Sequence, residues 1–151
     1  MWPFNKKTNY KGEVIEYLKH SMLGFIKNHP EMGAVITQIY SDATQIASRF
    51  SEKSLRKELI KGSVNIEFAA LNILQNCCML RLKQIPATEY VAGTLSDNDE
   101  YKESNIAHFL YDYVNELKLN KGYISETQYK ENKLLGIKLS VRSPLGQWMH
   151  I

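Results

Sequence analysis

Residues 64–80 read VNIEFAALNILQNCCML, a run of seventeen residues in which Glu67 carries the only formal charge. A run of that length approaches the minimum for a membrane-spanning helix, but a carboxylate and four carboxamides are too many polar groups for a lipid interior. On a helical wheel Asn65, Asn72 and Asn76 share a narrow arc, and apolar side chains occupy almost all of the remaining circumference. We therefore predict a central, largely buried helix over about 64–82.

The whole chain has the composition of one soluble globular domain. It contains 151 residues, of which 44% are hydrophobic and 23% are charged. A chain of that length can bury a core without disulfides or metals. Its net charge of +3 is too small to indicate nucleic-acid binding. We expect a single helical domain over residues 1–151.

Helical periodicity recurs on both sides of the central run. Apolar residues follow the i, i+3, i+4, i+7 spacing in 11–28, 32–50 and 106–117. The sequence Asn28-His29-Pro30 predicts the end of one helix and the start of the next. Gly122 closes a later helix and Ser125 opens another, which predicts an antiparallel helical hairpin. The predicted fold class is mainly α, a single-domain bundle of five or six helices.

The C-terminal part of the chain has a different pattern. Residues 135–142 alternate between apolar and polar side chains, which favours a short strand or an extended arm with one buried face. Residues 143–151 form an apolar C-terminal tail, and we expect its Trp148 to dock on this chain or on a neighbour. Residues 1–10 are interpreted as a flexible or docked tail.

The N-terminus and the cysteines indicate a compartment. No apolar segment typical of a signal peptide follows Trp2 and Phe4, so we expect a cytoplasmic protein without a transmembrane segment. These two aromatic residues, with Lys6 nearby, allow a weak contact with a membrane surface. Cys77 and Cys78 are adjacent, which disfavours a disulfide between them, and they are interpreted as small buried hydrophobic residues.

Recognisable catalytic and cofactor motifs are absent from the sequence, and we expect neither a cofactor nor a metal. The acidic stretch 97–100 begins like a calcium loop but lacks its glycine, and helix capping explains it better. Glu16 and His20, like His108 and Asp112, are four residues apart on predicted helices. Such pairs are usually minor surface interactions, although they can also hold a metal or transfer protons.

Glu67 is the most informative single residue. If its face of the central helix is buried, the carboxylate must either pair with a cation or shift its pKa upward. A carboxylate in an apolar pocket is a functional-site candidate, whereas a salt bridge to a lysine or arginine of another helix is the structural alternative. Arg81 lies at the far end of the same face. We take Glu67, Arg81 and His108 as candidate ligand-binding residues.

The helix that follows Pro30 has a polar face with almost no charge. Gln38, Ser41 and Gln45 lie on it, and Asp42 is the only charged residue between positions 32 and 48. Solvent-exposed helix faces usually carry lysine and glutamate, so this face indicates a contact with another chain or with a ligand. The alternative is an ordinary exposed helix of unusual composition. We take these three residues, together with Trp148, as candidate interface residues.

Charge is distributed unevenly along the chain. Residues 97–116 are strongly acidic, and residues 49–62 and 117–142 are basic, which favours oriented self-association. We expect a non-enzymatic cytosolic interaction or regulatory protein that acts through helix-face contacts, as a homo-oligomer or with a protein partner. The alternatives are a small-molecule or lipid-binding domain with a cavity near Glu67, and an enzyme that uses Glu67 with His108 or His20.

Overall fold

The computed structural model describes residues 9–54, 57, 65–84 and 103–140, and its elements are helices. In chain order they are α1 (Tyr10–Asn28), the 3-10 helix η2 (Pro30–Met32), α2 (Gly33–Ser48), α4 (Ile66–Gln84), α5 (Glu103–Asn120) and α6 (Glu126–Ser140). No strand occurs among these described residues. The mainly α fold class predicted from the sequence is confirmed.

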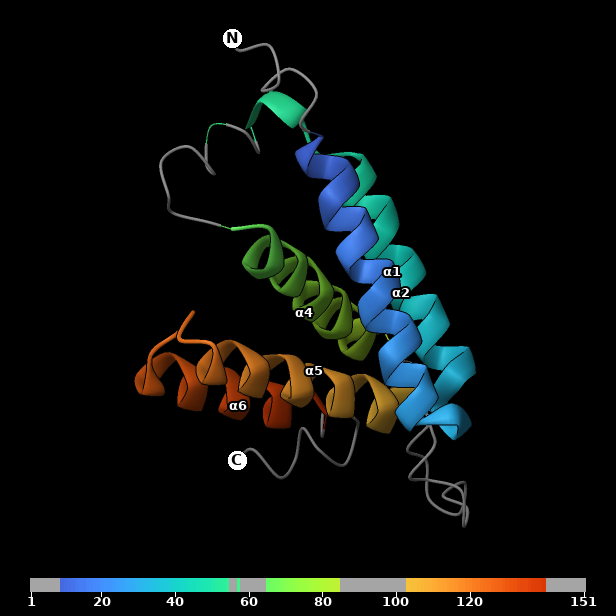
Figure 1. The fold of residues 1–151 in the computed structure, drawn as a ribbon. Helices are drawn as coiled ribbons and strands as arrows, with labels where there is room; N and C mark the ends of the chain where they lie inside the picture. Colours follow the sequence, from blue (N-terminus) through green and yellow to red (C-terminus); the bar gives the residue numbers. More distant parts are fainter. Residues whose placement is uncertain (1–8, 55–56, 58–64, 85–102, 141–151) are drawn as a thin grey trace, which may run out of the picture.

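The helices form two antiparallel pairs with α4 between them (Figure 1). The first pair is α1 and α2, and the break between them falls where the sequence predicts it. Helix α1 ends at Asn28, and Pro30 opens η2, because proline has no amide hydrogen to donate and suits a first helical turn. The side chain of Asn9 caps the other end of α1 by accepting a hydrogen bond from the Gly12 amide.

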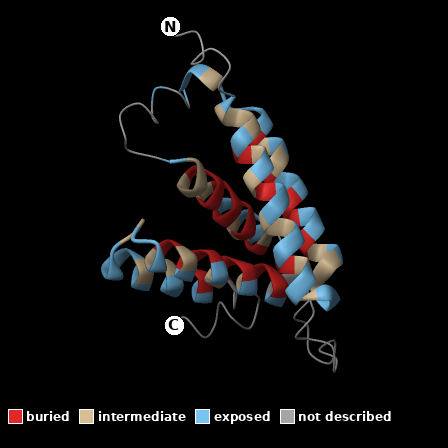
Figure 2. Ribbon diagram, in the orientation of Figure 1, coloured by how far each residue is buried: buried red, intermediate tan, exposed pale blue. Residues whose placement is uncertain are grey.

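The core forms around α4, as expected for the helix predicted at about 64–82. Figure 2 shows buried residues along most of α4 and along the face of α5 that meets it. Leu71 and Leu74 of α4 are fully buried and belong to one apolar cluster with Leu18 of α1, Ile39 of α2 and Leu110 of α5. Helix α4 is thus enclosed by neighbours, which explains why its apolar side chains surround it instead of forming one stripe.

The second pair is the α5–α6 hairpin, and its turn follows the predicted signals. Gly122 adopts a left-handed backbone with φ of 75°, a conformation that favours glycine after a helix end. Ser125 Oγ then accepts a hydrogen bond from the Gln128 amide at 3.1 Å, and Gln128 Oε1 accepts one from the Ser125 amide at 3.0 Å. This reciprocal capping box begins α6.

The strand or arm predicted over 135–142 is wrong for residues 135–140, which form the last turns of α6. The alternation placed Leu135 and Ile137 on a buried face, yet both are exposed. Gly136 and Leu139, three residues apart, are the buried ones. Gly136 faces the ring of Tyr111 on α5, so close packing of two helices, not strand alternation, determines this part of the chain.

Several sequence predictions fall outside the described residues. They concern the N-terminal tail with Trp2 and Phe4, the stretch 97–100 and the C-terminal tail with Trp148. Within the described parts of the chain, no helix combines the length and apolar character that crossing a membrane requires.

Candidate functional site

Glu67 links α4 to α1 and to the α5–α6 turn, at the end of the bundle where α4 begins. Its Oε1 accepts a hydrogen bond from the Tyr123 hydroxyl at 2.5 Å, and its Oε2 accepts one from the Tyr17 hydroxyl at 2.7 Å. Lys121, directly after α5, completes the cluster with an Nζ to Oε2 distance of 3.1 Å. Residues from α1, α4 and the α5–α6 turn are thereby linked through one carboxylate.

The electrostatics of this cluster differ from the first expectation for Glu67. Burial acts to raise the pKa of its carboxyl, but hydrogen bonds from Tyr123, Tyr17 and Lys121 outweigh burial, and the pKa is lowered. Burial, together with the hydrogen bond to Glu67, raises the pKa of Tyr17 above the usual tyrosine range. The prediction of a raised pKa for Glu67 is therefore wrong. The structure shows the alternative that the sequence left open, a salt bridge to a lysine outside the helix of Glu67.

Lys118, one turn before Lys121, is a buried cation that the sequence reasoning missed. Its side chain is only 4% exposed. Its Nζ donates hydrogen bonds to Asn72 Oδ1 and Gln75 Oε1, each at 2.5 Å, and lies 5.5 Å from the centre of the Phe68 ring. Because two neutral amides replace water around the ammonium group, burial lowers the pKa of Lys118 to about 8.

A sequence signal for this lysine was present. Tyr111, Asn115 and Lys118 repeat at i, i+4 and i+7 and are all buried, so α5 has a second inward face beside the apolar stripe that the sequence made obvious. Polar residues on that face concealed it. The Asn115 side chain donates to the Tyr129 carbonyl of α6 at 3.0 Å, whereas Lys118 contacts α4, so this second face packs against both helices.

Arg81 does not join Glu67. The two residues are fourteen positions apart on α4, a separation of about 21 Å along a helix. Arg81 instead reaches α2, where its Nη2 lies 2.8 Å from Asp42 Oδ2 and its Nη1 donates to Gln38 Oε1 at 3.3 Å. One residue proposed for ligand binding and one proposed for an interface are therefore neighbours on a different face.

The two histidines considered for chemistry each lie next to an acid of their own helix. His108 Nε2 lies 3.4 Å from Asp112 Oδ2 on α5. It precedes Lys121 by thirteen residues, about 20 Å along the helix, so the structure does not place His108 beside Glu67. His20 Nε2 lies 3.4 Å from Glu16 Oε1 on the exposed surface of α1. No set of three metal-ligating side chains gathers anywhere in the described ranges.

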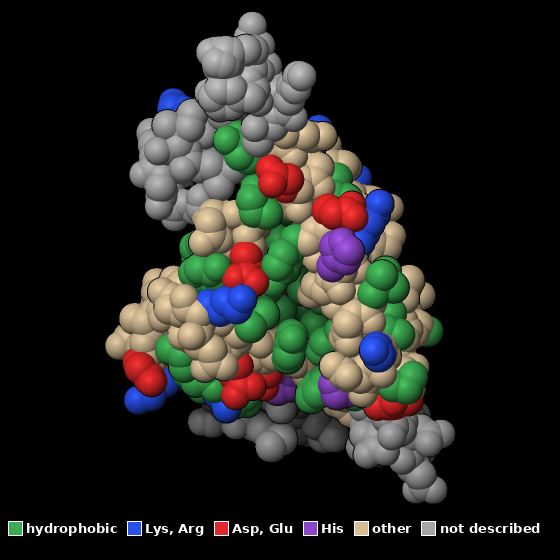
Figure 3. Space-filling view, in the orientation of Figure 1, with side chains coloured by type: hydrophobic (Ala, Val, Ile, Leu, Met, Phe, Trp, Pro, Cys, Tyr) green, Lys and Arg blue, Asp and Glu red, His purple; other side chains and the backbone are tan. Residues whose placement is uncertain are grey.

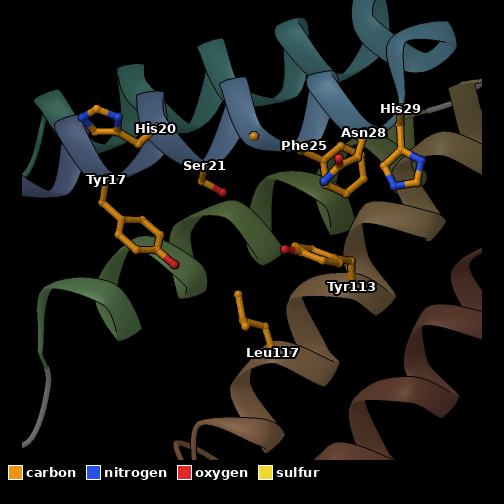
Figure 4. Close-up of a pocket in the computed structure, with 9 residues that line it drawn as sticks. Tyr17, His20, Ser21, Phe25, Asn28, His29, Tyr113 and Leu117 are labelled. Carbon is orange, nitrogen blue, oxygen red and sulfur yellow. The ribbon is translucent and has the colours of Figure 1, made fainter.

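A cavity of about 360 Å³ lies between α1 and α5, next to the Glu67 cluster. Tyr17 belongs to both, because its ring lines the cavity and its hydroxyl contacts Glu67. Figure 4 shows the lining side chains, with Tyr113 extending from α5 toward α1. Phe25 packs against Tyr113 with ring centroids 5.2 Å apart and against His29 at 4.7 Å. Figure 3 shows hydrophobic side chains gathered in the hollow between α1 and its neighbours.

A second recessed surface, here called the α2–α4 groove, lies between α2 and α4. It consists of two adjoining cavities of about 290 and 440 Å³, and Ile46 and Leu80 line both. The remaining lining residues are Asp42, Gln45, Arg49, Phe50, Ile73, Asn76, Cys77, Met79, Arg81 and Lys83. Gln45, predicted as an interface residue, lies in this groove, and Gln38 and Ser41 are exposed on the same helix.

Comparison with known proteins gives no match to any family model, curated protein or solved structure.

Proposed function

We propose that this chain is a non-enzymatic cytoplasmic interaction protein that acts through helix-face contacts and self-associates. The observation that carries the proposal is the α2–α4 groove, where Leu80 is 46% exposed and Phe50 is also exposed beside Ile46 and Met79. Exposed large apolar side chains around a recess are typical of surfaces that another molecule covers.

The chemistry of α2 supports this proposal. Its exposed face carries Gln38, Ser41 and Gln45, which lose less hydration energy than lysine or glutamate when a partner covers them. Asp42, the only charge there, is already paired with Arg81. Burying the exposed part of Leu80 would contribute up to about 1 kcal/mol. The cytoplasmic assignment is supported by Cys77 and Cys78, which are free and buried.

Sedimentation equilibrium of the wild-type chain and the variant Leu80→Glu tests the proposal. We expect the wild type to associate with increasing concentration and Leu80→Glu to remain monomeric, because the variant places a charge in the groove. Leu23→Glu is the matched control, since Leu23 on α1 is 62% exposed and lines neither groove cavity. A wild type that is monomeric at every concentration contradicts the proposal.

The second candidate function is small-molecule binding in the cavity between α1 and α5. Its volume of about 360 Å³ falls within the usual size range of ligand sites, and aromatic walls surround a few polar groups. Gly24 lines it with no atom within 4 Å of the position a Cβ would occupy, so Gly24→Leu fills the space without a clash at Cβ. Anilinonaphthalene sulfonate fluorescence should fall in Gly24→Leu relative to wild type, and equal fluorescence in both contradicts this candidate.

A further inference from the structure

Helix α5 has an exposed stripe formed by Phe109, Tyr113 and Glu116, here called the α5 stripe. These residues follow the i, i+4, i+7 spacing of one helix face. Glu116 is exposed, and Phe109 and Tyr113 are 41% and 43% exposed, while the covered part of both rings packs against Phe25 of α1. The same spacing anchors amphipathic helices that dock into apolar grooves. Two aromatic anchors also match what dominates binding energy at protein interfaces, since Trp, Tyr and other large rings contribute most there.

The α2–α4 groove has the complementary character. Its floor is apolar, and its rim carries Arg49, Arg81 and Lys83 against a single acid, Asp42. Arg81 and Asp42 neutralise each other at 2.8 Å, so Arg49 and Lys83 give the rim a positive surplus.

The α5 stripe has the opposite sign. Glu116 is exposed within it. Asp112 lies one turn before Glu116, but its side chain is only 34% exposed and its Oδ2 lies 3.4 Å from His108 Nε2, so Glu116 is the acid that the stripe presents to solvent. The groove therefore presents an apolar surface with a positive rim, and α5 presents two partly exposed aromatic rings beside one exposed acid, Glu116. Complementary charge sets the orientation and rate of association, and apolar contact supplies affinity.

We propose that the occupant of the α2–α4 groove is the α5 stripe of a second copy of this chain, an inference that rests on the self-association proposed above. The two surfaces belong to different elements, so each copy offers one groove and one stripe. Contacts of this kind are heterologous and join copies head to tail, in contrast to a two-fold dimer that uses one patch twice. Assemblies should then grow beyond a dimer as concentration rises.

Charge reversal on each surface tests the pairing. The groove variant is Arg49→Glu with Lys83→Glu, and the stripe variant is Glu116→Lys. Each should weaken self-association by roughly tenfold or more, because attraction becomes like-charge repulsion at the rim. An equimolar mixture should associate again and grow beyond a dimer, because the intact groove of one variant pairs with the intact stripe of the other and the acidic groove attracts the newly introduced lysine. Multi-angle light scattering measures both effects.

Matched controls keep net charge equal. Glu131→Lys on exposed α6 has the same charge change as the stripe variant, and Lys19→Glu with Lys27→Glu on exposed α1 has that of the groove variant. Both controls should associate like wild type. Thermal unfolding of each variant verifies that it is folded before association is measured.

The outcomes separate this inference from the proposal on which it depends. If the wild type associates and Leu80→Glu abolishes association, while Glu116→Lys associates like wild type, self-association stands and the α5 stripe is overturned as the occupant. If each variant alone fails to associate and the mixture does not recover association, the head-to-tail pairing is overturned. A strictly monomeric wild type overturns both this inference and the proposed self-association. A groove that binds a foreign acidic amphipathic helix but no second copy of this chain also overturns both.

Discussion

Replacing Gly136 by alanine should destabilise the protein although it places a better helix former in a helix. A Cβ at position 136 would lie 2.6 Å from Tyr111 Cε1 and 2.8 Å from its Cδ1, distances that van der Waals contact does not permit. The ring cannot swing aside freely, because Tyr111 is fully buried and its hydroxyl donates to the Asn132 carbonyl of α6 at 2.7 Å. Helices α5 and α6 must therefore separate to admit the methyl group.

Gly24→Ala is the matched substitution. Gly24 is also inside a helix, but no atom lies within 4 Å of its Cβ position. Each substitution gains about 0.5–1 kcal/mol from helix propensity, and only Gly136→Ala incurs overpacking of about 1–3 kcal/mol. We expect Gly24→Ala to stabilise the protein by up to about 1 kcal/mol and Gly136→Ala to destabilise it by up to about 2 kcal/mol.

Urea unfolding followed by far-UV circular dichroism measures both effects, provided that the slope of the transition stays unchanged between variants. A tyrosine near-UV signal that shifts only in Gly136→Ala supports movement around Tyr111. If Gly136→Ala raises the midpoint as much as Gly24→Ala does, the close approach of α6 to Tyr111 is refuted.

Further predictions concern buried ionisable groups. Between about pH 7 and 9 the unfolding free energy of wild type should rise by about 1 kcal/mol relative to that of Lys118→Met. The folded amine, with its pKa of about 8, releases its proton in this range, whereas the unfolded chain keeps the proton until about pH 10.5. Chemical denaturation measures the difference, and parallel profiles for the two proteins would contradict the burial of Lys118. Glu67→Gln should lower the stability of the protein near neutral pH. The stability difference from wild type should shrink as pH falls below the ordinary glutamate pKa of 4.5, because the Glu67 contacts that lower its pKa stabilise the fold only while the carboxylate is charged. Thermal melts across acidic pH measure this difference, and a difference that stays constant opposes the prediction. Burial raises the pKa of Cys77 to about 11 and that of Cys78 further, so iodoacetamide should modify both only when the protein unfolds; mass spectrometry that finds rapid labelling of the native chain would rule this out.

Helix boundaries were predictable from the sequence where local chemistry determines them. Pro30 cannot continue the hydrogen bonding of α1, Gly122 allows the left-handed turn after α5, and Ser125 with Gln128 satisfies the first amides of α6. The run at 64–80 was likewise sufficient to predict a buried central helix, because a solvent-exposed helix of that length would carry more than one charged side chain. These features depend only on residues a few positions apart.

The site was less predictable because it joins residues that are distant in sequence. Glu67 was identified as a candidate, but its partners Tyr17, Lys121 and Tyr123 are fifty or more residues away. Their hydrogen bonds reverse the expected direction of the Glu67 pKa shift. The burial of Lys118 was unpredictable for the same reason. A lysine near a helix end is normally solvated, and only the packing of α4 against α5 buries this one.

The sequence by itself determined the helical class, the central helix and most helix ends, since these follow from hydrophobic periodicity and backbone chemistry within a few residues. Only the tertiary structure decided that 135–140 continue a helix, because there Gly136 of α6 packs closely against Tyr111 of α5, a residue distant in sequence. It also decided that Arg81 joins α2 instead of Glu67, and that an apolar groove opens between α2 and α4. Such features depend on how faces of separate helices meet, which no local pattern specifies.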